Sequence, residues 1–273
     1  MLPYPQIDPV IFSFGPVQIR WYGLMYVLGF IATYLLIRKQ IRLYNLKELK
    51  KHFDNLNTIL IICLIIGGRL GYVFFYNPGY YLQHPMEILA TWHGGMSFHG
   101  GLIALIVGGY IFCRLKKLDF LNITDSYIVT APIGLGLGRL GNFINGELYG
   151  RITDQPWGMI FPGVNHYPRH PSQLYEALVE GLLLFIILWP MNRKKYEKNW
   201  PAGIIFVFFL ILYGVFRFLV EFFRAPDAHI GLWGGLLSRG QILCLIMIGL
   251  GVFLWYIFIR RTQKSQTRDT IRE

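Results

Sequence analysis

The sequence predicts an all-α polytopic membrane protein with seven transmembrane helices, an N-terminus outside the cytoplasm (periplasmic) and a cytoplasmic C-terminus. Of the 273 residues, 54% are hydrophobic and only 15% are charged, whereas a soluble domain carries about 25% charged residues. The charges cluster between long apolar stretches, and the basic residues fall on alternate loops. Composition and charge distribution therefore both indicate lipid as the solvent.

Seven segments are apolar and long enough to cross a bilayer, since a spanning helix needs about 20 mostly apolar residues. They are residues 19–37, 56–76, 94–113, 122–141, 171–190, 201–222 and 239–259. The first and last contain charge-free runs, Val27–Ile37 and Ile242–Ile259. The other five carry ionisable groups, which are costly in lipid and call for partners or a water-filled cavity.

The orientation follows from the basic residues. Eighteen of the 26, including all ten lysines, follow the first, third, fifth and seventh segments. The positive-inside rule places those loops in the cytoplasm, so the net charge of +11 does not indicate a nucleic-acid partner. The other eight basic residues are arginines, which suit bidentate contact with phosphate or carboxylate. They are Arg20, Arg69, Arg139, Arg151, Arg169, Arg217, Arg224 and Arg239.

The chain reads as a single transmembrane domain over residues 1–273. The N-terminus lacks a basic region, so we predict no cleavable signal peptide. Residues 142–170, rich in Gly, Pro and Asn, are expected to form a small cap on the outer face. Residues 260–273 are expected to form a basic cytoplasmic tail.

The sixth segment carries a polar face. At 100° per residue, Tyr213, Arg217, Glu221 and Arg224 share one side of a helix. Glu221 could simply neutralise the two arginines near the membrane surface. We favour a functional interpretation, in which two arginines for one carboxylate leave a surplus positive charge for an anionic ligand.

The fourth segment has glycines on one stripe that permit close helix packing and a polar end. Arg139 points away from that stripe, and Asn142, Asn145 and Glu147 follow at once. Ordinary helix caps would explain Asn145, but they would not explain Arg139. These groups are costly unless they line a cavity.

Three further polar positions allow both structural and functional interpretations. His99 is expected one or two turns inside the third segment, where a histidine is either structural or a general base. Tyr22 has the position of an interfacial aromatic residue. Glu176 and Glu180, one turn apart, are interpreted as structural partners of Arg69 or Arg139.

These polar groups of the first, third, fourth and sixth segments share one depth, the outer half of the bilayer. Phosphate is the natural anion there, because phospholipid headgroups lie at this depth. The sequence has no HExxH, paired-acid or Cys/His ligand pattern, so we expect no metal and no cofactor. This favours a reaction in which phosphate leaves and arginine takes up the developing charge.

Two other classes of protein, a serine hydrolase and a transporter, fit the sequence less well. Gly95-Met96-Ser97 lacks the final glycine of GxSxG, because position 99 is His, which disfavours a serine hydrolase. A transporter or flippase for an anionic lipid fits the composition. However, such proteins often contain inverted repeats, and the two halves of this chain show no convincing repeat.

The chain resembles the bacterial prolipoprotein diacylglyceryl transferases over nearly its whole length. The resemblance rests on five motifs: GGRLGYVFFYN (67–77), GGMSFHGGLI (94–103), GRLGNFINGELYG (138–150), PRHPSQLYEALVEG (168–181) and YGVFRFLVEFFRAPD (213–227). It implies a seven-helix transferase of the bacterial inner membrane. Such enzymes move the diacylglyceryl group of phosphatidylglycerol onto the lipobox cysteine of a prolipoprotein signal peptide, which is the first step of lipoprotein maturation.

The resemblance also implies roles for single residues. It assigns catalysis to Arg139, Arg217 and His99. It assigns substrate binding to Tyr22, Asn142, Glu147, Gly150, Tyr213, Glu221 and Arg224, and we add Asn145 from the residue pattern. The segment between FPG (161–163) and PRHPS (168–172) is short, whereas some relatives carry a large insertion there.

Overall fold

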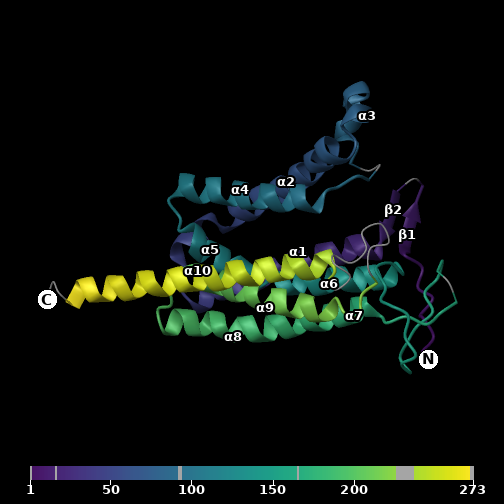
Figure 1. Cartoon of the computed structure of the whole chain (residues 1–273). Coiled ribbons are helices and arrows are strands. Elements are labelled where there is room, and N and C mark those ends of the chain that lie inside the picture. The colour runs from purple at the N-terminus through teal and green to yellow at the C-terminus, as the bar shows by residue number, and fades with distance from the viewer. Residues whose placement is uncertain (1, 16, 92–93, 165, 226–236, 271–273) are drawn as a thin grey trace. The chain divides into compact units, whose positions relative to one another are not determined.

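The computed structural model describes residues 2–15, 17–91, 94–164, 166–225 and 237–270. The last three residues of the predicted tail therefore lie outside the described residues. The described part is mainly helical (Figure 1). Its elements are β1 (Val10–Phe14), β2 (Val17–Arg20), α1 (Trp21–Leu43), α2 (Lys47–Tyr76), α3 (Pro78–Gln83), η1 (Pro85–Leu89), α4 (Phe98–Lys116), α5 (Phe120–Ile128), α6 (Ala131–Ile144), α7 (Ser172–Glu176), η3 (Ala177–Leu183), α8 (Leu184–Glu197), α9 (Ile204–Val220) and α10 (Arg239–Thr270).

The helices form two compact units, which we describe separately. The first unit comprises residues 1–39 and 124–273, and the second comprises residues 40–123. The first holds the hairpin, most of α1, and α6 to α10. The second holds α2, α3, η1 and α4.

Each of the seven predicted spans falls on helical structure, and five helices of the described part are long and apolar enough to cross a membrane. These are α1, α2, α4, the continuous helix Ser172–Glu197, and α10 over Arg239–Phe258. Helix α9 is apolar but shorter. The chain thus has the helices of a multi-pass membrane protein.

The fourth predicted span, 122–141, is not one helix. It is divided into α5 and α6 by a turn at Val129 and Thr130, where the Thr130 hydroxyl donates to the Tyr127 carbonyl oxygen at 2.7 Å. Pro132, in the first turn of α6, explains the break, because it has no N–H to donate to the carbonyl oxygen of Ile128 and its ring would clash with that carbonyl in a continuous helix. Helix α6 then extends to Ile144, beyond the predicted end.

A short antiparallel hairpin precedes α1 and departs from the all-α prediction. Strand β1 pairs with β2 with Phe14 opposite Val17 and Val10 opposite Arg20. The turn begins at Gly15, whose φ of +57° is a conformation that glycine adopts readily. In β2 (Val17–Arg20), β-branched and polar residues alternate, which is a pattern typical of strands.

A backbone-to-backbone contact sets the centre of the first unit. The continuous helix 172–197 contains a π-helical segment, η3, and such segments are rare and frequently lie at functional sites. A Cβ on Gly181 would lie 2.7 Å from the Cα of Gly136 in α6. Only glycine allows this approach, which brings the polar side of η3 against α6.

The start of α9 is fixed by a buried carboxylate from α5. Asp125 accepts the backbone N–H of Gly203 at 2.8 Å and of Phe206 at 2.9 Å. Its partner Lys195 in α8 lies 2.8 Å away, and both side chains are almost fully buried. Asp125 therefore satisfies helix N-terminal donors that α9 leaves unpaired. Figure 1 shows α8, α9 and α10 running alongside one another.

The predicted cap segment is ordered around a small aromatic core. Phe143, Met159 and Phe161 are buried together, and Tyr4 packs against them. The Tyr4 hydroxyl donates to the Phe143 carbonyl oxygen at 2.6 Å. The contact joins the N-terminal segment to the end of α6. Its location on the outer face stays a prediction.

In the second unit, Arg69 is satisfied by backbone and not by a glutamate. Gly94 and Gly95 have φ values of +84° and +79°, which bend the chain toward this guanidinium. Its nitrogen atoms donate to the carbonyl oxygens of Glu87, Ile88, Ala90, Gly94 and Gly95. The expected pairing of Glu176 or Glu180 with Arg69 is therefore replaced by an internal contact of the second unit.

Helices α2 and α4 pack through glycines. A Cβ on Gly67 would lie 2.7 Å from the carbonyl oxygen of Gly100, and a Cβ on Gly71 would lie 2.7 Å from the Cα of Gly100. Such distances leave no room for a methyl group. The two helices therefore touch along their backbones, as small residues permit in membranes.

Replacing Gly100 by alanine should force α2 and α4 apart and destabilise the protein by about 1–3 kcal/mol. Thermal unfolding in detergent, followed by intrinsic fluorescence, measures the effect. Gly249→Ala is the matched control, because a Cβ there has no neighbour within 4 Å. Equal thermal midpoints for the two variants would contradict the packing described.

Candidate functional site

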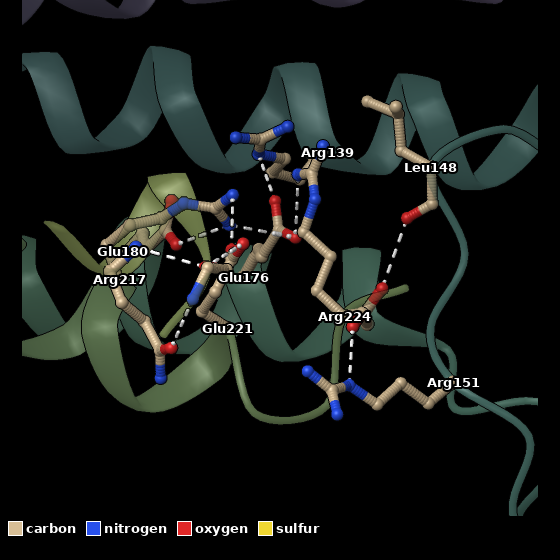
Figure 2. A network of polar contacts seen from close by, with 11 residues as sticks. Arg139, Leu148, Arg151, Glu176, Glu180, Arg217, Glu221 and Arg224 are labelled. Carbon is tan, nitrogen blue, oxygen red and sulfur yellow. Dashed lines mark hydrogen bonds and ion pairs between the residues drawn. The ribbon is translucent and has the colours of Figure 1, made fainter. Parts of the chain in front are cut away.

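Three arginines from different parts of the first unit meet at one buried carboxylate (Figure 2). Glu176, at the end of α7, lies with Oε2 2.5 Å from Nε of Arg139 in α6. Its Oε1 lies 3.2 Å from Nη1 of Arg217 in α9 and 3.4 Å from Nη1 of Arg224. Glu176 is completely buried. It therefore joins α6, α7, α9 and the chain after α9.

Arg217 has two further acidic neighbours. Its Nη2 lies 2.9 Å from Oε2 of Glu221, one turn later, and its Nη1 lies 3.6 Å from Oε1 of Glu180 in η3. Glu221 is held from the other side by the hydroxyl of Ser238, which donates to Oε1 at 2.9 Å. The carboxylate thus ties Arg217 to the residue before α10. We call Arg139, Glu176, Glu180, Arg217, Glu221 and Arg224 the arginine–glutamate cluster.

The cluster corrects the predicted charge balance. The sequence pattern suggested two arginines for one carboxylate, whereas the cluster contains three arginines and three glutamates. A surplus positive charge does not follow from that count. Glu176 and Glu180, interpreted as structural, belong to this site. Their spacing in PSQLYEALVEG was the available signal, because glutamates four residues apart inside a predicted span need partners.

Arg224 does not lie on the predicted helical face. Helix α9 ends at Val220, so the i, i+11 relation to Tyr213 does not apply. Arg224 instead forms an ion pair with Glu176, whereas the described residues show no hydrogen bond or ion pair between Arg224 and Glu221. Its carbonyl oxygen accepts Nε–H of Arg151 at 2.9 Å (Figure 2). Arg224 therefore links the cluster to the segment that follows α6.

Gly150 lies where that segment meets the end of the sixth span. It pairs with Arg224 in an isolated antiparallel bridge, and its N–H donates to the carbonyl oxygen of His170 at 2.8 Å. A Cβ there would lie 2.5 Å from the carbonyl oxygen of Phe223 and 2.7 Å from His170. Any larger residue would push this segment away from Arg224.

The side-chain amides of Asn142, in α6, and Asn145, the residue after its end, converge on one carboxylate. Asn142 donates to Oε1 of Glu147 at 2.8 Å, and Asn145 donates to the same oxygen at 3.1 Å. Asn142 is buried, whereas Glu147 is exposed. The backbone of Glu147 is also held, because Gln173 donates to its carbonyl oxygen at 2.6 Å. These contacts fix an exposed carboxylate beside the start of α7.

The two predicted tyrosines have different surroundings. Tyr22 in α1 lies against α6, since a Cβ on Gly141 would lie 2.9 Å from its ring, and its hydroxyl lies 3.1 Å from that of Tyr26. It is therefore beside the end of α6 that bears Arg139. Tyr213 stacks on Phe209 with a centroid separation of 5.5 Å. It packs in the hydrophobic core between α8 and α9.

His99 belongs to the second unit. It is the second residue of α4, so it lies in the first turn and not one or two turns inside. Ser97 caps this helix by accepting the N–H of Gly100 at 3.2 Å. The His99 side chain is exposed and meets Phe98 edge-on. Its proposed action with the arginines stays a prediction.

A second histidine, His170, lies in the first unit next to Gly150. Trp157 can only donate, and it donates to the Tyr175 hydroxyl oxygen at 2.7 Å. The Tyr175 hydroxyl also forms a hydrogen bond with Nδ1 of His170 at 3.0 Å, and its direction depends on the tautomer of the ring. Burial lowers the pKa of His170, which favours the neutral ring. This ring holds the cap segment to α7.

The cluster retains unused hydrogen-bond donors. Among the described residues, Nη1 and Nη2 of Arg139 have no partner, and its side chain is 20% exposed. Nη1 of Arg217 is buried beside two carboxylates but makes a directed hydrogen bond to neither. An arginine with both terminal nitrogens available can bind a phosphate or carboxylate through two parallel hydrogen bonds. The arrangement therefore suits a single anionic ligand.

Comparison with known proteins agrees with this geometry. The profile of the family described as prolipoprotein diacylglyceryl transferase matches residues 9–257. Three similar proteins, each named phosphatidylglycerol–prolipoprotein diacylglyceryl transferase, come from Desulfotalea psychrophila, Geobacter sulfurreducens and Bordetella avium. Their identities are 59%, 52% and 49%, over 96%, 95% and 97% of this chain and 97%, 98% and 100% of the relatives. Because the match spans nearly the whole chain, the protein belongs to the prolipoprotein diacylglyceryl transferase family.

Proposed function

We propose that the protein transfers the diacylglyceryl group of phosphatidylglycerol to the lipobox cysteine thiol of prolipoproteins, forming a thioether and releasing glycerol phosphate. The observation that supports this most directly is the arginine–glutamate cluster. It gathers three guanidinium groups within a mainly apolar helical unit and leaves the terminal nitrogens of Arg139 without a partner among the described residues. A lipid phosphate is the ligand that such donors suit.

In this proposal phosphate is a leaving group. The thiolate sulfur attacks the glyceryl carbon, a C–S bond forms, and the bond from that carbon to the phosphate oxygen breaks. The bond electrons pass to the phosphate, which gains negative charge. Arg139 and Arg217 stabilise that charge, while Glu221 and Arg224 orient them. Tyr22, Asn142, Asn145, Glu147, Gly150 and Tyr213 complete the substrate-binding set.

The thiol proton needs an acceptor, because a free thiol has a pKa of about 8.5 and is mostly protonated at neutral pH. His99 is the proposed general base, since neutral imidazole accepts protons near neutral pH. It is exposed at the first turn of α4, where solvent or substrate can reach it.

We further propose seven spans in the bacterial inner membrane, with α5–α6 and α9 as the two beyond the five long apolar helices. The basic loops then lie in the cytoplasm, and the cluster lies in the outer half of the bilayer. A secreted prolipoprotein presents its lipobox cysteine on that side. The orientation therefore brings both substrates to the arginines.

Purified protein should add one diacylglyceryl unit to a lipobox peptide when it is incubated with phosphatidylglycerol and a metal chelator. Mass spectrometry of the peptide measures the product. A peptide with serine in place of the lipobox cysteine is the control and should stay unmodified. Movement of labelled lipid across vesicles without any covalent product would instead favour a flippase.

Arg139→Lys and Arg217→Lys should each lower phosphatidylglycerol turnover by about 100-fold or more, as removal of one charge-stabilising donor does in other enzymes. Lysine keeps the positive charge but cannot form the bidentate contact. Release of glycerol phosphate measures turnover. Arg193→Lys is the control, because Arg193 forms an exposed pair with Glu197. Intact turnover in both cluster variants would exclude the proposed phosphate contact.

His99→Gln should lower transfer by about 100-fold or more, because a positioned general base contributes that much. Glutamine keeps hydrogen-bonding capacity but cannot accept the proton. The rate of transfer, compared with that of the wild-type protein from acidic to alkaline pH, is the measurement. Near-normal transfer across this range would show that His99 only positions lipid.

A further inference from the structure

Glu176 makes contacts that an ordinary structural ion pair does not need. It is completely buried and lies within 3.4 Å of three guanidinium groups, those of Arg139, Arg217 and Arg224. Each arginine comes from a different element or segment, and none follows from local sequence spacing. Three positively charged groups therefore converge on this one buried carboxyl group.

The same contacts determine where the arginines point. Arg139 turns its Nε toward Glu176, which leaves both terminal nitrogens directed elsewhere (Figure 2). Arg217 and Arg224 each contact Glu176 through Nη1 only. Glu176 thus lies within ion-pair distance of one nitrogen of each guanidinium group and attracts the three groups around one point. Without it, three like charges would repel one another.

Glu180, one π-helical turn later, has a single ion-pair contact among the described residues. Its side chain is fully buried, and neither carboxyl oxygen has a hydrogen-bond partner among the described residues. Its nearest cation is Nη1 of Arg217 at 3.6 Å, while Glu221 and Glu176 lie nearer to that arginine. An ionised carboxylate without hydrogen bonds is costly to bury.

The groups that face Glu180 do not remove this cost. They are Arg139 from α6, Glu176 from its own helix, Tyr213 and Arg217 from α9, and Cys244 from α10. The two arginines favour the ionised form, but both contact Glu176 at shorter distance. The negative charge of Glu176 and the apolar surroundings oppose ionisation of Glu180. The geometry favours a proton on this carboxyl group.

We propose that Glu176 is the ionised positioning residue that directs the three arginines toward the lipid phosphate, and that Glu180 carries a proton. Three guanidinium groups then face two ionised carboxylates, those of Glu176 and Glu221. The cluster carries one net positive charge, which a phosphodiester monoanion neutralises. This inference rests on the proposed function of the cluster as the site of the phospholipid headgroup.

The test compares steady-state transfer by full-length Glu176→Gln, Glu176→Asp, Glu180→Gln and wild-type protein, with phosphatidylglycerol as the varied substrate. Glu176→Gln should raise KM for the lipid by about tenfold or more, because a charge-assisted contact to each arginine is lost. Glu176→Asp keeps the charge and should recover part of that loss. Glu180→Gln should raise KM less than Glu176→Gln does, since an amide there replaces a neutral acid of equal size and leaves the contacts of Glu176 in place.

The KM readout separates positioning from folding. A merely structural defect lowers the amount of active enzyme and hence the apparent kcat, but leaves KM unchanged. Glu197→Gln, an exposed position of the same continuous helix, controls for loss of a carboxylate. If Glu176→Gln does not fold, Glu176→Asp decides the matter through its KM. A wild-type KM in the folded Glu176 variants, or an equal rise in Glu180→Gln, would overturn the proposal.

Infrared spectra of the wild-type protein and of the variants test directly for a proton on Glu180. A protonated carboxylic acid has a carbonyl stretching band that an ionised carboxylate lacks. That band should be lost in Glu180→Gln and kept in Glu197→Gln, and its persistence in Glu180→Gln would refute the assignment. Wild-type protein that transfers no lipid would refute the proposed function instead, so the two failures are distinguishable.

Discussion

The buried contact of Glu176 with three arginines is the interaction on which the arrangement of the first unit depends. It joins α6, α7, α9 and the chain that leads toward α10. The close approach of Gly136 and Gly181 makes it possible, since bulkier residues would hold η3 away from α6. Away from this cluster, Asp125 fixes the first turn of α9. Together these contacts fix the position of α9 in the first unit and hence the position of Arg217.

Such a network is expensive, and its cost limits the explanations available. Burying ions in an apolar region is unfavourable unless each is paired, and a well-packed apolar cluster often stabilises as well or better. A purely structural network would be expected to use all of its donors. The cluster instead leaves the terminal nitrogens of Arg139 without partners among the described residues, and Nη1 of Arg217 without a directed hydrogen bond. Unused donors at a costly site favour a ligand-binding role.

Local periodicity explains what the sequence could predict. The apolar segments and the i, i+4 pairing of Arg217 with Glu221 depend on neighbours along one helix. The structure confirms the pairing, and it confirms helices long and apolar enough to cross a membrane for five of the segments. The contact of Arg224 with Glu176 joins residues 48 positions apart, so no helical spacing reveals it. Pro132 is the sequence signal for the break between α5 and α6, but the apolar run around it favoured the prediction of one continuous helix. The charge balance was misjudged for the same reason, because Glu176 lies on another helix.

The chemistry also constrains where a base can lie. Displacement at a saturated carbon requires the thiolate to approach opposite the leaving phosphate, so the groups that hold phosphate and the group that accepts the proton must be separate. Within the first unit, Glu176 lies against three arginines, and Glu147 accepts hydrogen bonds from two amides. Neither is a suited base. The proposed reaction therefore calls for a proton acceptor outside the arginine–glutamate cluster, and this is the reason for proposing His99, on the first turn of α4, as the base.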